Sequence, residues 1–230
     1  MSFLYCSVTL CSNPKTFQPT RTARRAFRIQ APSTIRQSCQ TLDFTQEFAP
    51  LVMPPMLVLR RPREDEEGEF IRAYRATTPE VPSFLHDYEE GMSLSRYLQV
   101  LEERERGVNL PPNHVPSTFL FAFHGERIVG RVAIRHMLND FLQPVGGHIG
   151  YVVVPQFRRL GYATAMLRLA LQFAHNQLGL DHVLVTCDDD NIGSIKTIEN
   201  NGGVLESVIS GPDLNKPKRR YWIDARRAAE

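Results

Sequence analysis

One continuous stretch of the chain constrains the fold most: an apolar strand, a short basic loop, a long helix and a second strand. "GGHIGYVVVP" (146–155) has the apolar run of a strand and is ended by proline. "HVLVTC" (182–187) has the pattern of a buried strand. Between them, one apolar helical face is predicted at Ala163, Leu167, Ala170, Leu171 and Ala174. A crossover helix favours parallel strands, and a site is expected where the first strand feeds the helix.

The remaining segments predict a mixed α/β chain. Strands are expected at 56–62, on either side of a hairpin turn at 124–126, and at 204–210 and 220–225. Helices are expected at 64–77, around Leu94 to Leu101, and at 191–203. Prolines break the intervening segment 78–93, which is expected to be an irregular loop. The predicted order is β-α-α-β-β-β-α-β-α-β-β, with a hairpin-built antiparallel half.

Charge is distributed unevenly along the 230 residues. Six of the 27 Lys and Arg, and none of the 25 Asp and Glu, precede Asp43, which leaves 21 basic and 25 acidic side chains, or −4, from Asp43 onward. A mildly acidic domain argues against a nucleic-acid-binding face. No apolar run approaches the roughly 18 residues of a membrane span, so neither nucleic acid nor a membrane is an expected partner.

The first 52 residues are expected to be an extension that precedes a single folded domain at 53–230. Their start is rich in Arg, Ser and Thr and free of acids, which fits a transit peptide, a disordered tail, or translation that begins at Met53 or Met56. Three of the four cysteines lie in this extension, so no disulfide framework can hold the domain. A reducing, cytoplasmic location is expected, with a mitochondrion or plastid as the alternative if the extension is a transit peptide.

The basic loop carries the most informative short motif. Arg158, Gly161 and Ala163 fit the pattern [QR]-x-x-G-x-[GA] between a strand and a long helix. The first turn of a helix leaves backbone N–H groups without intrahelical partners and favours an anion. Gly161 removes the Cβ where backbone must approach a ligand, and the arginines can neutralise phosphate charge. A pyrophosphate is therefore the expected ligand.

At this motif the chain resembles the GNAT superfamily of acetyl-CoA-dependent N-acetyltransferases. The resemblance rests on "HIGYVVVP", the basic loop with its helix, "HVLVTC" and "NIGSIKTIENNGG", in that order. Its specific motifs extend from Gly147 to Gly203, and "IRHMLNDFL", "GGHIGY" and "RRYWI" are similar to a bacterial-type subgroup of predicted acetyltransferases. The resemblance implies a GNAT-like acyl-CoA N-acyltransferase fold with a splayed central pair of parallel strands.

The same resemblance implies how acetyl-CoA would bind. Backbone amides from the first turn of the long helix would hold the pyrophosphate, at Leu160, Gly161, Tyr162, Ala163 and Thr164. Arg158 and Arg159 would be the charge partners of this group. Free backbone groups of the strand Gly150 to Val154 would pair with the pantetheine arm. A backbone amide near Val152 or Val153 would bind the thioester carbonyl, and Val154 would also contact the cofactor. Asn191 would contact the arm from the start of the next helix.

Direct attack of a neutral amine on the thioester, in a ternary complex, is the chemistry that the resemblance implies. The amine is of unknown identity, the enzyme is a monomer or homodimer, and no metal is expected. The family's frequent acid is a Tyr seven residues after the Asn; that position is Ile198 here, which cannot donate a proton. The proposed base is His148 at the start of the first strand, with His136 as the second choice. The missing Tyr motivates an alternative: a non-catalytic acyl-CoA-binding or sensing module.

Overall fold

The computed structural model describes residues 57–212 and 214–228. The predicted extension, residues 1–52, lies outside the described residues. Four antiparallel strands form a first sheet in the order β1 (Leu57–Arg60), β2 (Ser117–His124), β3 (Arg127–Arg135) and β4 (Ile149–Val153). The predicted hairpin is confirmed: β2 and β3 are joined at Gly125, whose φ of +59° suits a tight turn.

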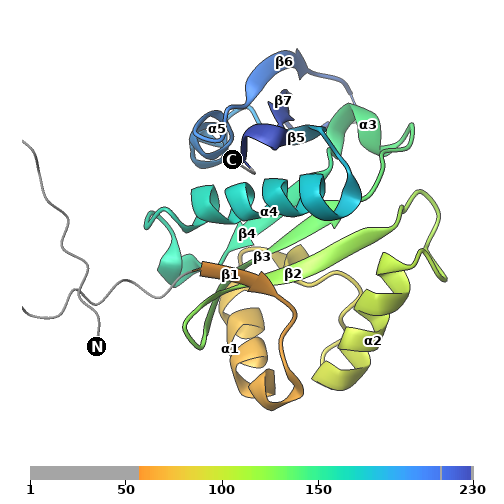
Figure 1. The fold of residues 1–230 in the computed structure, drawn as a ribbon, viewed down its shortest axis with the longest axis vertical. Helices are drawn as coiled ribbons and strands as arrows, with labels where there is room; N and C mark the ends of the chain where they lie inside the picture. The colour runs from red at the N-terminus through yellow and green to blue at the C-terminus, as the bar shows by residue number, and fades with distance from the viewer. Residues whose placement is uncertain (1–56, 213, 229–230) are drawn as a thin grey trace, which may run out of the picture. The chain divides into compact units, whose positions relative to one another are not determined.

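Two helices, α1 (Glu67–Thr77) and α2 (Leu94–Glu105), cover one face of this sheet (Figure 1). Their core is aromatic because β2 sends alternate residues to this face, namely Phe119, Phe121 and Phe123. The segment between α1 and α2 contains only a short 3-10 turn, η2 (Pro82–Phe84), so the predicted irregular loop is confirmed. Another 3-10 turn, η1 (Glu64–Glu66), leads into α1.

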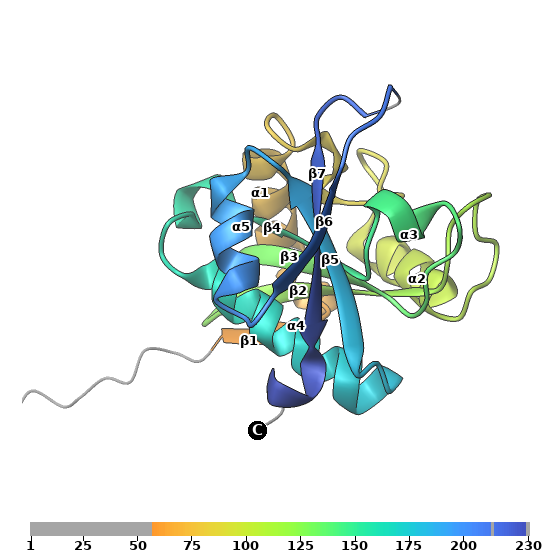
Figure 2. The ribbon, with the colours of Figure 1, turned by 90° about the horizontal axis from the view of Figure 1, so that it is seen from above.

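The long helix α4 (Tyr162–Leu178) packs on the opposite face. It lies between the first sheet and a second antiparallel sheet, ordered β5 (His182–Asp188), β7 (Lys218–Asp224) and β6 (Val204–Ile209) (Figures 1 and 2). Leu167, Ala170 and Leu171 of α4 are fully buried there, which confirms the predicted apolar face. The helix α5 (Ile192–Glu199) follows β5, and a final turn, η4 (Ala225–Ala228), contacts α4.

The strands β4 and β5 are the facing edges of the two sheets, and they diverge. In the described part of the chain, one backbone hydrogen bond joins the segments, from His148 N–H to Leu184 O at 2.7 Å. Neither strand is paired with the other along its length. The predicted mixed α/β fold with a splayed strand pair is therefore confirmed, with the pair closed only at its start.

Two short elements between β3 and α4 were not predicted. A single turn of helix, α3 (Leu142–Val145), lies between β3 and β4 and begins where Asn139 Oδ1 accepts the Leu142 N–H at 2.9 Å. A 3-10 turn, η3 (Pro155–Phe157), links β4 to the basic loop. Both are too short to give a periodic sequence pattern.

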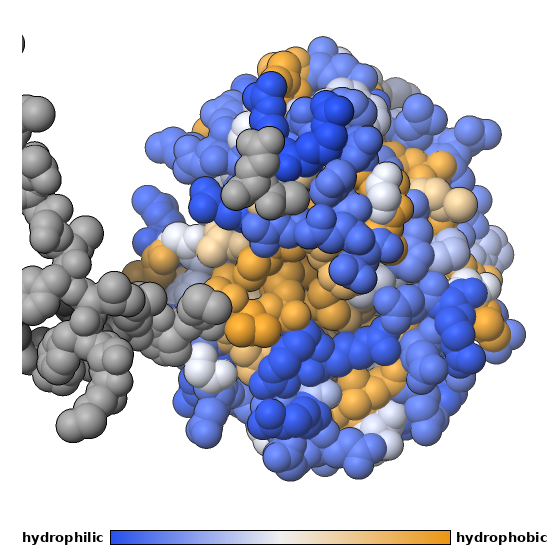
Figure 3. Space-filling view, in the orientation of Figure 1, coloured by the Kyte–Doolittle hydropathy of each residue, from blue (hydrophilic) through white to orange (hydrophobic). Residues whose placement is uncertain are grey.

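Apolar side chains reach the surface in the middle of the face seen in Figure 3, at the level of α4, and polar residues surround them. The helices of the described residues include none with the length and apolar character to cross a bilayer.

Candidate active site

The open edge of β4 presents a defined set of backbone groups. Arg135 N–H donates to His148 O at 2.8 Å, and Val154 N–H donates to Val129 O at 2.9 Å. Because hydrogen-bonded pairs alternate in an antiparallel ladder, Gly150 and Val152 also direct their backbone groups toward β3. The backbone groups of Tyr151 and Val153 therefore face the gap toward β5.

This alternation distinguishes the two backbone amides, of Val152 and Val153, named in the prediction for the thioester carbonyl. Of the two amides expected to reach a thioester carbonyl, the Val152 amide is directed into the sheet, whereas the Val153 amide is directed away from β3. The Val154 amide is used by Val129 O. Edge strands offer unpaired N–H and C=O groups to an extended partner, so an amide-containing chain can fit between β4 and β5.

The basic loop at the end of β4 is a row of free donors. Gly161 caps α4 with a φ of +81°, and Arg159 also has a left-handed φ of +65°. Within the described residues, no acceptor takes the amide hydrogens of Leu160 to Thr164, and Ala165 N–H is the first to bond back, to Gly161 O at 3.2 Å. A Cβ on Gly161 would have no atom within 4 Å, so the space above the loop is open. Five adjacent donors at a helix start can hold an anion.

The side chains around the basic loop differ in their contacts. Arg158 is ion-paired with Glu80 at 2.5 Å and donates to Val153 O at 3.3 Å, which ties the loop to the segment after α1. Arg159 is exposed. The Tyr162 hydroxyl is 2.6 Å from Nδ1 of His124, so this side chain packs toward the end of β2 and only its backbone faces the loop.

Asn191 is the N-cap of α5. Its Oδ1 accepts the Ser194 N–H at 3.0 Å, and the residue is exposed. It therefore fixes where α5 begins at the end of β5. The predicted contact of Asn191 with a cofactor arm stays a prediction.

Tyr151 is a candidate that the sequence analysis did not identify. Its side chain leaves β4 on the α4 side and crosses to α5, where the hydroxyl donates to Ser194 O at 3.5 Å. Burial raises the pKa of Tyr151 to about 12, so the phenol is protonated at neutral pH. Ser194 lies four residues before Ile198, the buried position where the family pattern has a Tyr. Alternation along β4 could have indicated the direction of Tyr151, but not its reach to α5.

His148 lies at the closed end of the strand pair and is buried. Its Nδ1 accepts the Leu184 N–H at 3.0 Å, and its ring centroid is 6.4 Å from that of Trp222. Burial, followed by the nearby Arg135, lowers the pKa of His148. The ring is therefore neutral at pH 7 with its hydrogen on Nε2, and proton acceptance at Nδ1 requires release of the Leu184 amide.

His136 has the opposite arrangement. Thr118 Oγ1 donates to Glu105 Oε1 at 2.7 Å, so His136 Nε2–H donates to Thr118 Oγ1 at 2.9 Å. Its Nδ1 then carries the free lone pair. Burial lowers the pKa of His136 as well. His136 follows β3, whereas His148 precedes β4, so the two predicted bases do not share one hydrogen-bonded cluster.

Other chemistries find little support in the geometry. Burial raises the pKa of the Cys187 thiol to about 11, so it is not a thiolate nucleophile at neutral pH. Within residues 57–212 and 214–228, no three His, Cys, Asp or Glu side chains are grouped to hold a metal ion.

Comparison with known families and structures adds a second line of observation. The family described as acetyltransferase (GNAT) domain matches residues 56–204. No curated protein matches the chain by sequence. Among solved structures, Mycobacterium smegmatis RimJ in complex with a CoA-disulfide is 17% identical, with a TM-score of 0.54 over 75% of this chain and 86% of that chain.

Two further structures are similar at the same level. RimL, a ribosomal L7/L12 alpha-N-protein acetyltransferase in complex with coenzyme A, is 16% identical, with a TM-score of 0.53 over 74% of this chain and 95% of its own. The microcin C7 self-immunity acetyltransferase MccE, in complex with acetyl-CoA and AMP, is 18% identical, with a TM-score of 0.52 over 72% and 91%. At these identities the likeness shows a shared fold.

Proposed function

The chain belongs to the GNAT acetyltransferase family, and from this we propose that it transfers the acetyl group of acetyl-CoA to an amine by direct attack in a ternary complex. The observation that carries the proposal is the row of free amides from Leu160 to Thr164 at the open end of the gap between β4 and β5. This arrangement suits a ligand with a pyrophosphate at one end and an extended amide chain at the other.

In the proposed mechanism, backbone groups perform most of the binding. The amides of Leu160 to Thr164 hold the pyrophosphate, with Arg159 and Arg158 beside them, and Asn191 lies by the arm. The open edge of β4 pairs with the pantetheine amides. The Val153 N–H donates a hydrogen bond to the thioester oxygen and stabilises the negative charge that develops there. The amine nitrogen bonds to the carbonyl carbon, the C–S bond breaks, and the coenzyme A thiolate leaves.

We assign protonation of the leaving thiolate to Tyr151. Its hydroxyl lies between β4 and α5, within one helical turn of Ile198. Tyr151 can therefore supply, from β4, the phenol that the family pattern has at position 198 of the helix. The raised pKa keeps the phenol protonated at neutral pH, and its hydrogen must turn from Ser194 O to the leaving sulfur. A thiol with a pKa near about 8.5 can leave as thiolate, so Tyr151 accelerates the step without being indispensable.

The attacking amine must lose a proton to a base. The two candidate histidines differ in their position and in which ring nitrogen is free. His148 lies on the β4 side of the gap but has its Nδ1 engaged by Leu184. His136 has an available Nδ1 but lies beyond the end of β3. We keep His148 as the first candidate because it is the histidine next to the strand pair, with His136 second.

The test of the function is an acceptor screen on the full chain. Acetyl-CoA affinity is measured by calorimetry, and thiol release is followed with amines that include polyamines, amino acids and peptide N-termini. Acceptor-dependent thiol release together with acetyl-CoA binding is the expected result. Binding without acceptor-dependent thiol would overturn catalysis and leave the non-catalytic acyl-CoA-binding module, which the buried Ile198 favours. Absence of binding would overturn both.

A further inference from the structure

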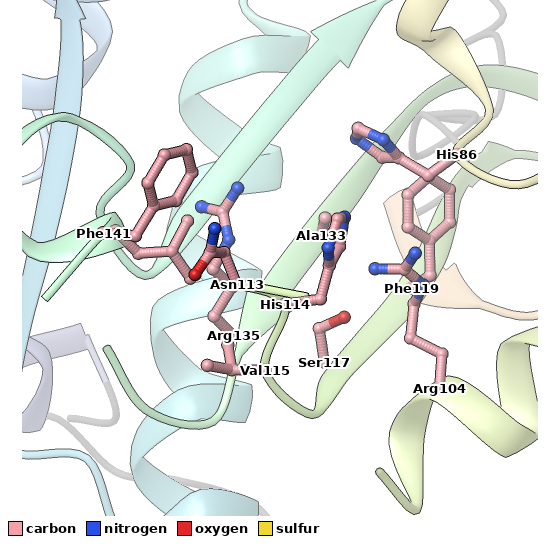
Figure 4. Close-up of a pocket in the computed structure, with 11 residues that line it drawn as sticks. His86, Arg104, Asn113, His114, Val115, Ser117, Phe119, Ala133, Arg135 and Phe141 are labelled. Carbon is pink, nitrogen blue, oxygen red and sulfur yellow. The ribbon is translucent and has the colours of Figure 1, made fainter. Parts of the chain in front are cut away.

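A cavity of about 190 Å³ lies on the face of the first sheet that α1 and α2 cover. It is bounded by the ends of β2 and β3, the segment before β2 and the start of α3 (Figure 4). Ser117 and Ala133 lie between two arginines, Arg135 on one side and Arg104 on the other. The cavity is next to β4, because Ala133 is the register partner of Gly150.

Positive charge in this region exceeds negative charge. Arg135 donates only to the backbone carbonyls of Gly146 and Gly147, at 2.9 and 2.7 Å. Arg131, two residues before Ala133 on β3, does not line the cavity; it donates to the carbonyls of Phe84 and Ser83 and is 4% exposed. In the described part of the chain, no carboxylate lies within 4.0 Å of either guanidinium.

A third guanidinium, that of Arg104, does have a carboxylate partner: it is paired with Asp87, which is 39% exposed. The neighbouring His86 does not add to the positive charge, because burial, followed by Arg131 and Arg104, lowers its pKa to about 4. Charges in a low-dielectric site normally carry a partner, since an unpaired one is costly. Of the two guanidiniums without a carboxylate, those of Arg135 and Arg131, only that of Arg135 lines the cavity, and because carbonyls alone hold it, an anion in the cavity can be its partner.

We propose that this cavity is the acceptor subsite and that it binds a carboxylate of the acceptor through Arg135, with the Asp87-paired Arg104 on the opposite wall. The proposal rests on the acetyl transfer proposed above and names the substrate class: a small amine that also carries a carboxylate. Ser117 adds a hydroxyl donor, and Phe119 and Val115 supply an apolar wall around the chain between the two charged ends.

The sheet register sets the separation between amine and carboxylate. Ala133 and Arg135 lie three and five residues along β3 from Gly130, the partner of Val153, which is on the order of 10 and 17 Å at ~3.4 Å per residue. A single α-amino acid cannot bridge that distance. A tripeptide spans roughly 10 Å when extended, which places its carboxylate at the level of Ala133, in the cavity that the Arg135 side chain also lines.

The experiment compares matched amines on the full chain. Triglycine and triglycinamide share the same amine end and differ by the carboxylate, and glycine with glycinamide gives the short pair. We expect KM for triglycine to be about 10- to 100-fold below that for triglycinamide, which corresponds to one charge-assisted contact. The short pair should show no such ratio. Calorimetry of triglycine in the presence of coenzyme A gives the same comparison without turnover.

Variants separate the cavity from a general charge effect. Arg135→Met should bring the triglycine to triglycinamide ratio to about one, and the exposed Arg106→Met is the matched control with the ratio of the parent. Because Arg135 also holds the Gly146 and Gly147 carbonyls, Ala133→Asp is a second variant. It places a carboxylate beside Arg135, keeps those bonds and should exclude triglycine in the same way.

The outcomes distinguish the two proposals. Equal KM values for the two tripeptides, or a ratio unchanged in Ala133→Asp and a folded Arg135→Met, would overturn the carboxylate subsite while acetyl transfer to other amines stands. Triglycine binding that depends on Arg135, without thiol release for any amine, would support the subsite as an anion site and overturn the transfer reaction. Ratios that collapse in both cavity variants and persist in Arg106→Met would support the subsite.

Discussion

At the scale of single residues, Gly161 combines a backbone requirement with the pyrophosphate contact that we propose. Its left-handed φ of +81° favours glycine, while the open space above it lets a small side chain fit sterically. Gly161→Asp should weaken acetyl-CoA binding at least 100-fold because it places a negative charge against the pyrophosphate.

Gly161→Asn is the control for this variant, since asparagine tolerates left-handed backbone and has the same size without charge. It should retain most of the affinity by calorimetry. Equal loss in both variants would assign the effect to backbone strain, and unchanged affinity in Gly161→Asp would refute the loop as the pyrophosphate site.

Tyr151 is tested by removal of one oxygen atom. Tyr151→Phe should lower kcat by about 10²-fold with acetyl-CoA, in the range of a lost general acid. The loss should shrink with an acetyl thioester of an acidic aromatic thiol, which leaves without protonation. Tyr88→Phe, at the aromatic cluster beside α1, is the control. An equal loss with both donors would make Tyr151 structural.

For His148, the conservative variant decides between a base and a positioning role. Glutamine can accept the Leu184 N–H as Nδ1 does but cannot act as a base near neutral pH. If His148 is the base, His148→Gln loses turnover and the acid-side limb of the pH profile, where His148 becomes protonated, while His136→Gln keeps both. A His148→Gln enzyme with near-normal rates, beside an inactive His148→Ala, would leave His148 as a support of the strand contact.

At the scale of elements, the divergence of β4 and β5 depends on close contact at their start. Gly147 has a φ of +63°, and a Cβ there would lie 2.8 Å from Leu184 O and 3.3 Å from Thr186 N. Since Leu184 is held by His148, a side chain at this point must push the two strands apart.

Gly147→Ala should therefore lower the free energy of unfolding by about 2–4 kcal/mol, which is more than the ~1 kcal/mol expected from backbone strain alone. Gly125→Ala is the matched control, because its φ is also positive, +59°, and nothing lies within 4 Å of its Cβ. Denaturant unfolding compares the two. Equal losses would show that the contact between β4 and β5 is not tight.

At the scale of the whole molecule, stability should fall in mild acid. His86, His136 and His148 all have a pKa lowered by burial, that of His86 to about 4. The unfolded chain binds these protons near pH ~6.5, before the folded chain does. The contribution of these histidines to the free energy of unfolding is therefore complete above pH ~6.5 and is lost as the pH falls from there toward 4.

His86→Gln should reduce that acid loss by on the order of 2 kcal/mol between pH 7 and 4.5, measured by denaturant unfolding at both values. His182→Gln, at an exposed position, is the control and should leave the difference unchanged. A parent protein with equal stability at both pH values would contradict the prediction.

The sequence by itself determined the order of elements, the hairpin turn at Gly125, the apolar face of α4 and the basic loop at its start. Each depends on local spacing: period two, period three to four, a glycine or a proline. It also identified the family, because the motifs lie on consecutive elements.

Only the tertiary structure decided which groups face the same space. The ladder between β3 and β4 selects the Val153 amide over that of Val152. Tyr151 reaches α5 across 43 positions of chain, and Arg104 faces Arg135 across a cavity between separate elements. These contacts have no local sequence signature, because they depend on how the two sheets and the helices pack together rather than on the period within any one element.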